Sequence, residues 1–565
     1  ENLLEFTRDR KTGQIIEEKQ GEHIVSRTYD GEGNCTRITS SLGADIRHTY
    51  DREGNLQTMQ AGESWQASWV RDNTGLEVQR TFSGGVTVST ERDRFGREVR
   101  KSVRSGGIER GAYRYEWGIA NRLLSKENEL TGTVMRYDYD RFDFLIRQET
   151  TQGSETDVIY RVPDFVGNLF GTPDRKDRKY GAGGKLLEDP DCFYHYDDEG
   201  NLIFREFKQL QETGVRYDRK RMEKERGIRC LATGTGWLYE WASNGMLKKV
   251  IRPDGRPVEF RYDALGRRTA KQYFGKVTHW VWDGNVPIHE WSYRISDMQP
   301  DKEENGPSKE PTEDITTWVF EVGTFVPTAK IQEGKQYSIV SDYLGTPIQM
   351  YNELGNKIWE CTLDIFGEVT NFEGNSLNDC PFRYQGQYKD EETELYYNRF
   401  RYYSQEIGGY LSQDPIRLAG NNPTIYGYVR DTCTNTDPFG LMPWPNPINS
   451  GHHLVYANKA RSVGLDHLAS NTDTPTYFFN EPYAPGTHER VHASQRKFVG
   501  PRQGPWTGSA EELIEASKKG LIGLDDIKGK LIIPSTGEIL AENATPLEAF
   551  EKLEEWHKRK MASIH

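Results

Sequence analysis

One phrase of about a dozen residues recurs along the chain, and it limits the fold more than any other feature. Each copy is a strand-like run that ends in Tyr-Asp or a variant of it, a turn that usually contains glycine, and a second run. The clearest copies are "RTYDGEGNCTRI" (28–39), "HTYDREGNLQTM" (48–59), "YHYDDEGNLIFR" (194–205) and "FRYDALGRRTAK" (260–271), and weaker ones are "ERDRFGREVRKS" (91–102), "YDYDRFDFLIRQ" (137–148) and "YEWASNGMLKKV" (239–250). Each copy predicts a β-hairpin, because Asp bonds the turn backbone and Gly takes its left-handed position.

A single hairpin of this length has no core of its own, so the copies must bury their faces against one another as an array. The composition fits, since the chain has 55 Gly and 30 Tyr, and Tyr suits a half-buried pleated surface. We therefore expect a mainly β fold.

Charge, cysteine content and hydropathy exclude several classes of protein. The net charge of −13 argues against a globally basic nucleic-acid binder, and no stretch reaches the roughly 18 apolar residues of a membrane span. The six Cys are scattered without a C-x-x-C pair, which favours free thiols over a disulfide or metal framework. No signal peptide is visible, and the chain starts at Glu1 inside a repeat, so we expect a fragment of a longer protein.

Two later stretches carry a family resemblance. They are "YLGTPIQMYNELGNKIWECTLDIFGEV" (343–369) and residues 382–441, which begin "FRYQGQYKDEETELYYNRFRYY" and end "TNTDPFGL". Together with the repeats they resemble the C-terminal part of Rhs proteins, which are YD-repeat polymorphic toxins. The resemblance implies a YD-repeat β-cocoon, a spiralling antiparallel sheet that encloses a variable toxin. It implies a shell over 1–380, a self-cleaving segment over 381–441 and a toxin domain over 442–565. The charged run 296–315 interrupts the pattern and predicts a flexible surface insertion.

Two Asp-Pro pairs lie near the end of the Rhs-like segment, at Asp414 and Asp437. Paired carboxylates can share a proton, one acting as base on a water and the other as acid, as in aspartic proteases. From spacing alone, both Asp could equally be turn residues before Pro. The resemblance implies that they cut the chain after Leu441. Arg417 stands where the first motif usually has Gly, which leaves the local turn geometry open.

The composition changes after Leu441, where seven of the 12 His fall and helix signals appear. Ser509 and Glu512 form a capping box before a helix that Gly520 closes, and Thr545 with Pro546 opens another. The stretch 530–540 between them predicts a hairpin. These signals predict a separate small α+β domain.

The histidines of this domain fit two competing motifs. "THERVH" contains H-E-x-x-H, the signature of a zinc protease helix, with His488, Glu489 and His492. Upstream, "SGHHLVY" places His452 and His453 side by side. Two His at i and i+4 share one helix face and can bind one ion, whereas neighbours on an extended strand point to opposite faces. Only one of the adjacent pair can then join that ion, and the other is free to act as a base.

The order of these residues resembles the ββα-metal finger of the HNH/Endonuclease VII superfamily, in the toxin branch with a Gly-His-His signature. The resemblance implies a metal-dependent DNase in which His452, His488 and His492 bind Mg²⁺ or Zn²⁺ and His453 activates water. Such chemistry needs a divalent ion at the phosphate and a general base. Basic residues that could line a phosphate groove are Lys459, Arg461, Arg496, Lys497 and Arg502. His467 and His557 are expected to have no catalytic part.

Two alternatives stay open. A zinc peptidase would use Glu489, with Glu511 or Glu515 as a plausible third ligand, but Pro485 and Gly486 start the helix at its His pair, whereas a protease helix normally holds that pair well inside. That reading also leaves the His pair at 452 and 453 unexplained. The other alternative is a non-catalytic YD-repeat surface or adhesion protein.

The Rhs resemblance also implies a biological setting. We expect an antibacterial effector that type VI secretion delivers through an N-terminal region outside this fragment. It would reach the cytoplasm of a target cell, where DNA is the substrate, and a cognate immunity protein would protect the producer. Self-association is left open.

Overall fold

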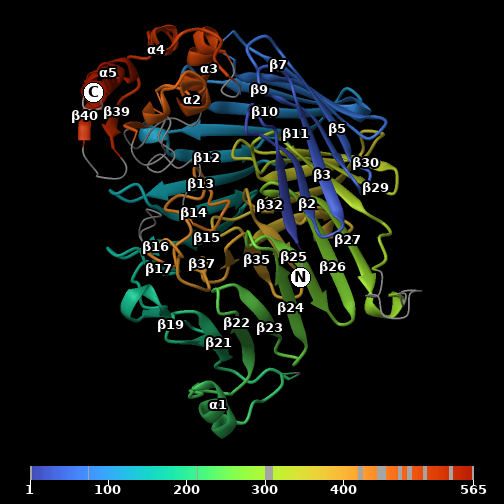
Figure 1. The fold of residues 1–565 in the computed structure, drawn as a ribbon. Coiled ribbons are helices and arrows are strands. Elements are labelled where there is room, and N and C mark those ends of the chain that lie inside the picture. The colour runs from blue at the N-terminus through green and yellow to red at the C-terminus, as the bar shows by residue number, and fades with distance from the viewer. Residues whose placement is uncertain are drawn as a thin grey trace. The chain divides into compact units, whose positions relative to one another are not determined.

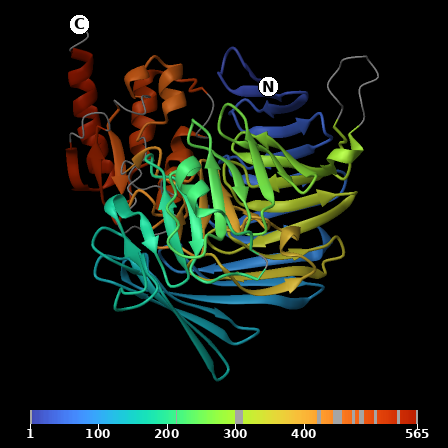
Figure 2. The ribbon, with the colours of Figure 1, turned by 90° about the horizontal axis from the view of Figure 1, so that it is seen from below.

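A computed structural model describes residues 3–73, 75–212, 214–298, 310–417, 424–441, 454–468, 474–479, 487–500, 505–533 and 539–562. Figures 1 and 2 show its ribbon from two sides. The chain forms two compact units. One contains residues 1–4, 20–23 and 131–444, and the other contains residues 5–19, 24–130 and 445–565. The predicted domain boundaries at 380 and 441 stay predictions.

The first strands follow chain order as antiparallel neighbours (Figure 1). They are β1 (Leu4–Arg8), β2 (Ile15–Gln20), β3 (His23–Tyr29), β4 (Cys35–Ser40), β5 (Asp45–Tyr50), β6 (Leu56–Ala61), β7 (Trp65–Arg71), β8 (Glu77–Phe82), β9 (Val86–Arg92), β10 (Glu98–Ser105), β11 (Ile108–Trp117) and β12 (Leu123–Asn128). Each neighbour is reached through a short turn, as the hairpin array predicts.

The unit containing residues 131–444 continues the pattern. Its first strands are β13 (Thr133–Tyr139), β14 (Leu145–Gln152), β15 (Glu155–Tyr160) and the short pair β16 (Val162–Pro163) and β17 (Leu169–Phe170). A 16-stranded sheet follows in chain order: β18 (Lys179–Tyr180), β19 (Leu186–Glu188), β20 (Cys192–Tyr196), β21 (Leu202–Phe207), β22 (Gly236–Trp241), β23 (Leu247–Ile251), β24 (Pro257–Tyr262), β25 (Arg268–Tyr273), β26 (Lys276–Asp283), β27 (Val286–Arg294), β28 (Thr316–Phe320), β29 (Pro327–Gln332), β30 (Lys335–Ser341), β31 (Pro347–Tyr351), β32 (Lys357–Leu363) and β33 (Val369–Gly374). The helix α1 (Arg219–Arg226) is inserted between β21 and β22.

All seven predicted hairpins are confirmed as antiparallel strand pairs. In most of them the register shifts at the residue just before the turn Asp, as at Tyr50, where Tyr50 pairs with Leu56. The turn itself is held by the Asp side chain, since Asp51 Oδ1 accepts the N–H groups of Glu53 at 3.0 Å and Asn55 at 2.8 Å. Gly54 completes the turn with a φ of 77°. We call this arrangement the Asp turn.

Residues 381–441 add a four-stranded sheet made of β34 (Tyr388–Asp390), β35 (Leu395–Asn398), β36 (Arg401–Ser404) and β37 (Gly409–Tyr410). Two buried tyrosines of this sheet, and Tyr384 just before it, hold the last Asp turn of the array, at residues 364–367. The carbonyls of Asp364, Phe366 and Gly367 accept hydroxyl hydrogen bonds of 2.7 to 2.9 Å from Tyr384, Tyr403 and Tyr396, respectively. The final repeat is therefore fixed by this sheet through its backbone.

The terminal domain has its own core and a three-stranded antiparallel sheet. Its elements are α2 (Ala457–Ser462), β38 (Thr476–Phe479), α3 (Thr487–Val499), α4 (Ala510–Lys519), β39 (Gly529–Ile532), β40 (Ile539–Ala544) and α5 (Pro546–Ala562). The predicted capping box of Ser509 with Glu512 is present, and Thr545 forms a second one with Glu548 at the predicted start of α5. The predicted hairpin is β39 and β40. The prediction of a small α+β domain is thus confirmed.

Two smaller expectations can also be compared with the structure. All six Cys are free thiols, as predicted. Most of the predicted insertion, residues 299–309, lies outside the described residues. Within the described part of the chain, no helix combines the length and the apolar character needed to cross a membrane.

The buried Asp turn at residues 364–367 gives a pH-dependent stability. Burial raises the pKa of Asp364 from its usual 3.8 to about 6. The folded state therefore prefers the protonated carboxyl, and the free energy of unfolding should fall by about 3 kcal/mol as the pH rises from about 4 to about 6. Asp364→Asn should abolish this fall while keeping the turn, because Asn352 makes the same turn contacts.

The measurement is urea unfolding, followed by tryptophan fluorescence, of the unchanged protein and the variant between pH 4 and 8. The difference between the two proteins isolates Asp364 from the other acidic groups. Asp51→Asn, in a more exposed Asp turn, is the matched control. A difference that does not change with pH would contradict the prediction.

Candidate active sites

Asp414 and Asp437 are brought together around one arginine that the sequence analysis did not select. Arg401, the first residue of β36, places Nη2 2.9 Å from Asp414 Oδ2 and 3.4 Å from Asp437 Oδ2. All three residues are buried, with exposed fractions of 0%, 2% and 0% for Arg401, Asp414 and Asp437. The predicted carboxylate pair is therefore a compact, buried cluster with the Arg401 guanidinium between its two members.

The second oxygen of each carboxylate is bound within its own turn. Asp414 Oδ1 accepts the N–H of Ile416 at 2.9 Å, and Asp437 Oδ1 accepts the N–H of Leu441 at 2.8 Å. These are the two contacts of the Asp turn, to the second and the fourth residue after Asp. Both motifs are thus versions of the repeat's turn, and each leaves Oδ2 to face Arg401.

The backbone conformation of Arg417 shows that the first Asp-Pro motif keeps its turn geometry. Its φ is 54°, the left-handed conformation that Gly440 adopts in the second motif with a φ of 66°. Arg417 therefore keeps the turn that glycine would make, at the modest cost of a left-handed non-glycine residue. Gly440 cannot be replaced so easily, because a Cβ there would lie 2.6 Å from the Asn398 carbonyl oxygen.

Asp437 receives further hydrogen bonds from the same sheet. Tyr410 donates its hydroxyl to Asp437 Oδ2 at 2.8 Å, and Asn398 Nδ2 donates to the Asp437 carbonyl at 2.6 Å. The Tyr410 ring lies 3.6 Å from the guanidinium carbon of Arg401. Arg401 also donates to the carbonyl oxygen of Gly440, next to the predicted cleavage residue Leu441. The segment next to the predicted cleavage point is thereby tied to the acid cluster through its own backbone.

The surroundings of the two carboxyl groups differ. Burial raises the pKa of Asp414, against the opposing effects of the Arg401 charge and the Ile416 N–H. Asp414 therefore keeps its proton to a higher pH than an exposed Asp. Asp437 accepts from Tyr410, Leu441 and Arg401, and donors of this kind stabilise a charged carboxylate. This asymmetry suits an acid and a base acting together.

In the terminal domain, the flank of the predicted His pair is fastened to α3. Gln495 Nε2 donates to the Leu454 carbonyl at 2.8 Å, and the Tyr456 hydroxyl donates to the His492 carbonyl at 3.2 Å. The same hydroxyl lies 3.3 Å from His492 Nδ1. The residues that directly follow "GHH" thus contact the helix that carries His492.

The predicted metal ligands are only partly described. His452 and His453 lie outside the described residues, as do the side chains of His488 and Glu489. Among the described side chains, no three His, Cys, Asp or Glu groups come together as a metal site. The nuclease and peptidase assignments both stay predictions. Of the peptidase's candidate third ligands, Glu511 is exposed on α4, and Glu515 pairs with Lys519 at 2.9 Å.

The predicted phosphate contacts differ in exposure. Arg461 and Lys497 are exposed and Arg496 is partly buried, while Arg502 lies outside the described residues. Lys459 is only 4% exposed, its ammonium lies 5.9 Å from the centroid of the Trp506 ring, and burial lowers its pKa. This burial counts against a surface contact of Lys459 with DNA, because the lysine stem is packed into the core. His467 and His557 form a pair at 2.7 Å.

Two known protein families match different parts of the chain. Residues 86–424 match the family described as Teneurin YD-shell, and residues 448–561 match the one described as Toxin protein PT1. The chain belongs to the YD-shell family. Its YD shell is followed by a domain of a toxin family, which confirms the predicted resemblance to YD-repeat polymorphic toxins.

Several curated relatives of this YD-shell protein are named as toxins or nucleases. The "Probable deoxyribonuclease RhsA" of Dickeya dadantii is 27% identical over 462 residues, which cover 79% of this chain and 29% of that protein. The "Toxin protein Tse5" of Pseudomonas aeruginosa is 27% identical, covering 78% and 37%. The "Double-stranded DNA deaminase toxin A" of Burkholderia cenocepacia is 26% identical, covering 78% and 30%. The chain thus spans well under half of these proteins.

A solved structure supports the fold of the YD shell. The Photorhabdus luminescens Tc holotoxin pore, determined with a TccC3 variant, aligns with a TM-score of 0.51 at 17% identity. The alignment covers 76% of this chain and 23% of that one.

Removing the cation from the acid cluster should destabilise the shell. Arg401→Met keeps the side chain's length but leaves two buried carboxyl groups without their partner, and such a loss costs about 3–5 kcal/mol. Urea unfolding at pH 7 should therefore begin at a lower concentration. Adding Asp414→Asn should restore part of the loss. Arg430→Met, at an exposed arginine, is the matched control and should change little. Equal midpoints for Arg401→Met and Arg430→Met would contradict the account.

Proposed function

We propose that this YD-shell protein cuts its own chain after Leu441 and so releases its terminal domain, which is a metal-dependent nuclease toxin. The observation that carries the first half is the buried cluster in which Arg401 joins Asp414 and Asp437. The cluster is bonded to Gly440 and Leu441, the last residues before the bond to be cut.

The chemistry of the cut follows from the asymmetry of the two carboxyl groups. Ionised Asp437 takes a proton from a water that attacks the Leu441 carbonyl carbon, while protonated Asp414 gives its proton to the departing amide nitrogen. The products are a carboxylate on Leu441 and an amine on Met442. Arg401 holds both acids in place and balances the charge between them.

Self-cleavage predicts two bands on a denaturing gel for the unchanged chain, with a new C-terminus at Leu441 by mass spectrometry. Asp437→Asn and Asp414→Asn should each leave the full-length band. Because burial raises the pKa of Asp414, its proton persists to a higher pH, and the cleavage rate should fall as the pH rises through that pKa. Asp364→Asn, at a buried turn outside the cluster, is the matched control. Complete cutting in Asp437→Asn would contradict the assignment.

The nuclease half of the proposal draws on the relatives and on α3. Relatives are named a probable deoxyribonuclease and, in Bacillus spizizenii, a "tRNA3(Ser)-specific nuclease WapA", whereas another is named a DNA deaminase. Similarity in the shell therefore does not determine the chemistry of the toxin. The nuclease proposal rests on the residues of this chain's terminal domain. The contacts of Leu454 and Tyr456 with α3 support a site in which the "GHH" segment meets the helix.

A divalent ion, Mg²⁺ or Zn²⁺, fits the described part of this donor set. The Tyr456 hydroxyl beside Nδ1 of His492 is the kind of oxygen partner that orients a ligating imidazole. His452, His488 and His492 would hold the ion, which when bound would stabilise charge on the phosphate oxygens. His453 would take a proton from the attacking water. Lys497 and Arg461, both exposed, would contact phosphates.

The setting belongs to the same proposal. The shell would enclose the toxin, type VI secretion would deliver it, and it would act on DNA in the cytoplasm of a target cell. A cognate immunity protein would bind it in the producing cell.

Plasmid cleavage tests the nuclease directly. The fragment 442–565 should fold alone, since its buried core is drawn from this stretch only. It should linearise plasmid DNA with Mg²⁺ or Zn²⁺ but not with chelator. His453→Ala should lower the rate by at least about 100-fold, the usual contribution of a general base. His492→Ala, which removes a proposed metal ligand, should also lower it.

Two control variants separate the alternatives. Glu489→Gln should leave DNA cleavage intact, and His557→Gln, outside the proposed site, should do the same. DNA cleavage that survives His453→Ala but fails with Glu489→Gln would contradict the assignment of His453 as the base. An intact plasmid under every ion would contradict the nuclease assignment.

A further inference from the structure

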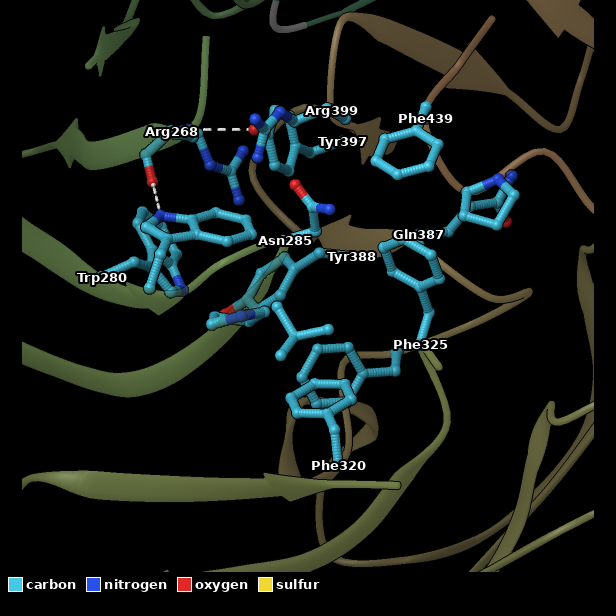
Figure 3. A pocket seen from close by; sticks show the side chains of 16 residues that line it. Arg268, Trp280, Asn285, Phe320, Phe325, Gln387, Tyr388, Tyr397, Arg399 and Phe439 are labelled. Atoms are coloured by element: carbon cyan, nitrogen blue, oxygen red, sulfur yellow. Dashed lines mark hydrogen bonds between the residues drawn. The ribbon is translucent and has the colours of Figure 1, made fainter. Parts of the chain in front are cut away.

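The turn proposed to be cut carries one aromatic side chain, and that side chain faces a cavity in the shell. The cavity measures about 30 Å³ and lies between strands of the 16-stranded sheet and the terminal segment. Figure 3 shows Phe439 beside Phe325, with Tyr397, Arg399 and Gln387 around the same space. Aromatic and apolar side chains dominate the lining.

Phe439 is held there by both its ring and its backbone. The ring meets that of Phe325 edge to face, with centroids 5.1 Å apart and planes at 89°. The Phe439 carbonyl accepts the N–H of Phe400 at 3.2 Å. The preceding Pro438 packs directly against Gly386, where a Cβ would come within 2.3 Å of the Pro438 carbonyl oxygen. The shell is therefore shaped to the turn at two successive residues.

In several other turns of this kind the side chain at the same position is exposed, although Phe366, in the Asp364 turn, is only 8% exposed. Leu354 is 74% exposed, Phe142 is 60% exposed and Leu265 is 43% exposed, although each is the third residue of its turn, as Phe439 is. An apolar residue is thus common at this position of the repeat, and several copies fold without burying it. At the cleavage turn, however, the shell provides a partner ring.

Phe439 also stands midway between the groups that must be aligned. It lies two residues after Asp437 and two before Leu441. A shift of the turn by about 1 Å can lower the rate of a positioned reaction about 100-fold. A ring fixed in the middle of the turn limits such a shift at both ends.

We propose that Phe439, seated against its aromatic cavity, is a positioning residue for self-cleavage. It takes no part in the chemistry, and it holds the Leu441 carbonyl in register with the two acids. This inference rests on the proposed self-cleavage after Leu441.

The test follows the full chain in cell-free translation, so that cutting can be timed from synthesis. Phe439→Ala should slow cleavage about 10- to 100-fold, and Phe439→Leu should slow it less. Leu265→Ala, at the same turn position without a cavity, is the matched control and should cleave like the unchanged chain. Benzene or toluene should restore much of the Phe439→Ala rate, because an apolar cavity left by truncation binds such rings.

Each outcome separates this inference from the function on which it depends. If the unchanged chain is not cut, self-cleavage fails, and this inference fails with it. If the unchanged chain and Phe439→Ala are cut at the same rate, only the positioning role is overturned. A slow Phe439→Ala that neither benzene nor the Leu variant improves would also overturn it, since that result indicates general damage to the fold.

Discussion

The hydrogen bonds of one aspartate carboxylate to two backbone N–H groups underlie most of this structure. Asp51 shows the arrangement, with bonds to the second and fourth residues after it. The carboxylate satisfies donors that a tight turn leaves unpaired, and a left-handed residue lets the chain reverse. Because turns of this kind recur along the array, as at Asp30, Asp263 and Asp364, a long run of short strands can stay in chain order without crossing connections.

The terminal segment of the shell, residues 381–441, binds the Asp364 turn through its backbone. Tyrosine hydroxyls from residues 381–441 donate to backbone carbonyls of the turn that contains Asp364. These contacts depend on the geometry of the turn backbone and hardly on which side chains the turn carries. Burying so many polar groups is costly unless each finds a partner. Arg401 supplies the largest share of that pairing near Asp437, where it contacts two carboxylates and the Gly440 carbonyl.

The sequence predicted the parts of this fold that local chemistry dictates. Tyr-Asp and Gly at fixed spacing specify a hairpin without help from the rest of the chain, and capping boxes specify where α4 and α5 begin. The Asp pair was visible through the Rhs resemblance, because Asp-Pro by itself also occurs at Asp189. Arg401 was not, because "NRFRYYS" has no motif, and its role depends on two segments that only the folded chain brings to it. The same limit hid Phe325, whose partner ring is more than a hundred residues away.

The turn around Asp437 has a consequence for how a self-cutting protein can arise. Its hydrogen bond to Leu441 is the bond that Asp364 makes to Glu368, in a turn with no such arginine and acid pair described beside it. Duplication of hairpins would therefore have supplied the bent, backbone-anchored peptide before any catalytic use existed. Only the partners around it had to be gained, namely a second turn of the same kind and one arginine. In evolutionary terms, the proposed cleavage site is a repeat unit that acquired neighbours.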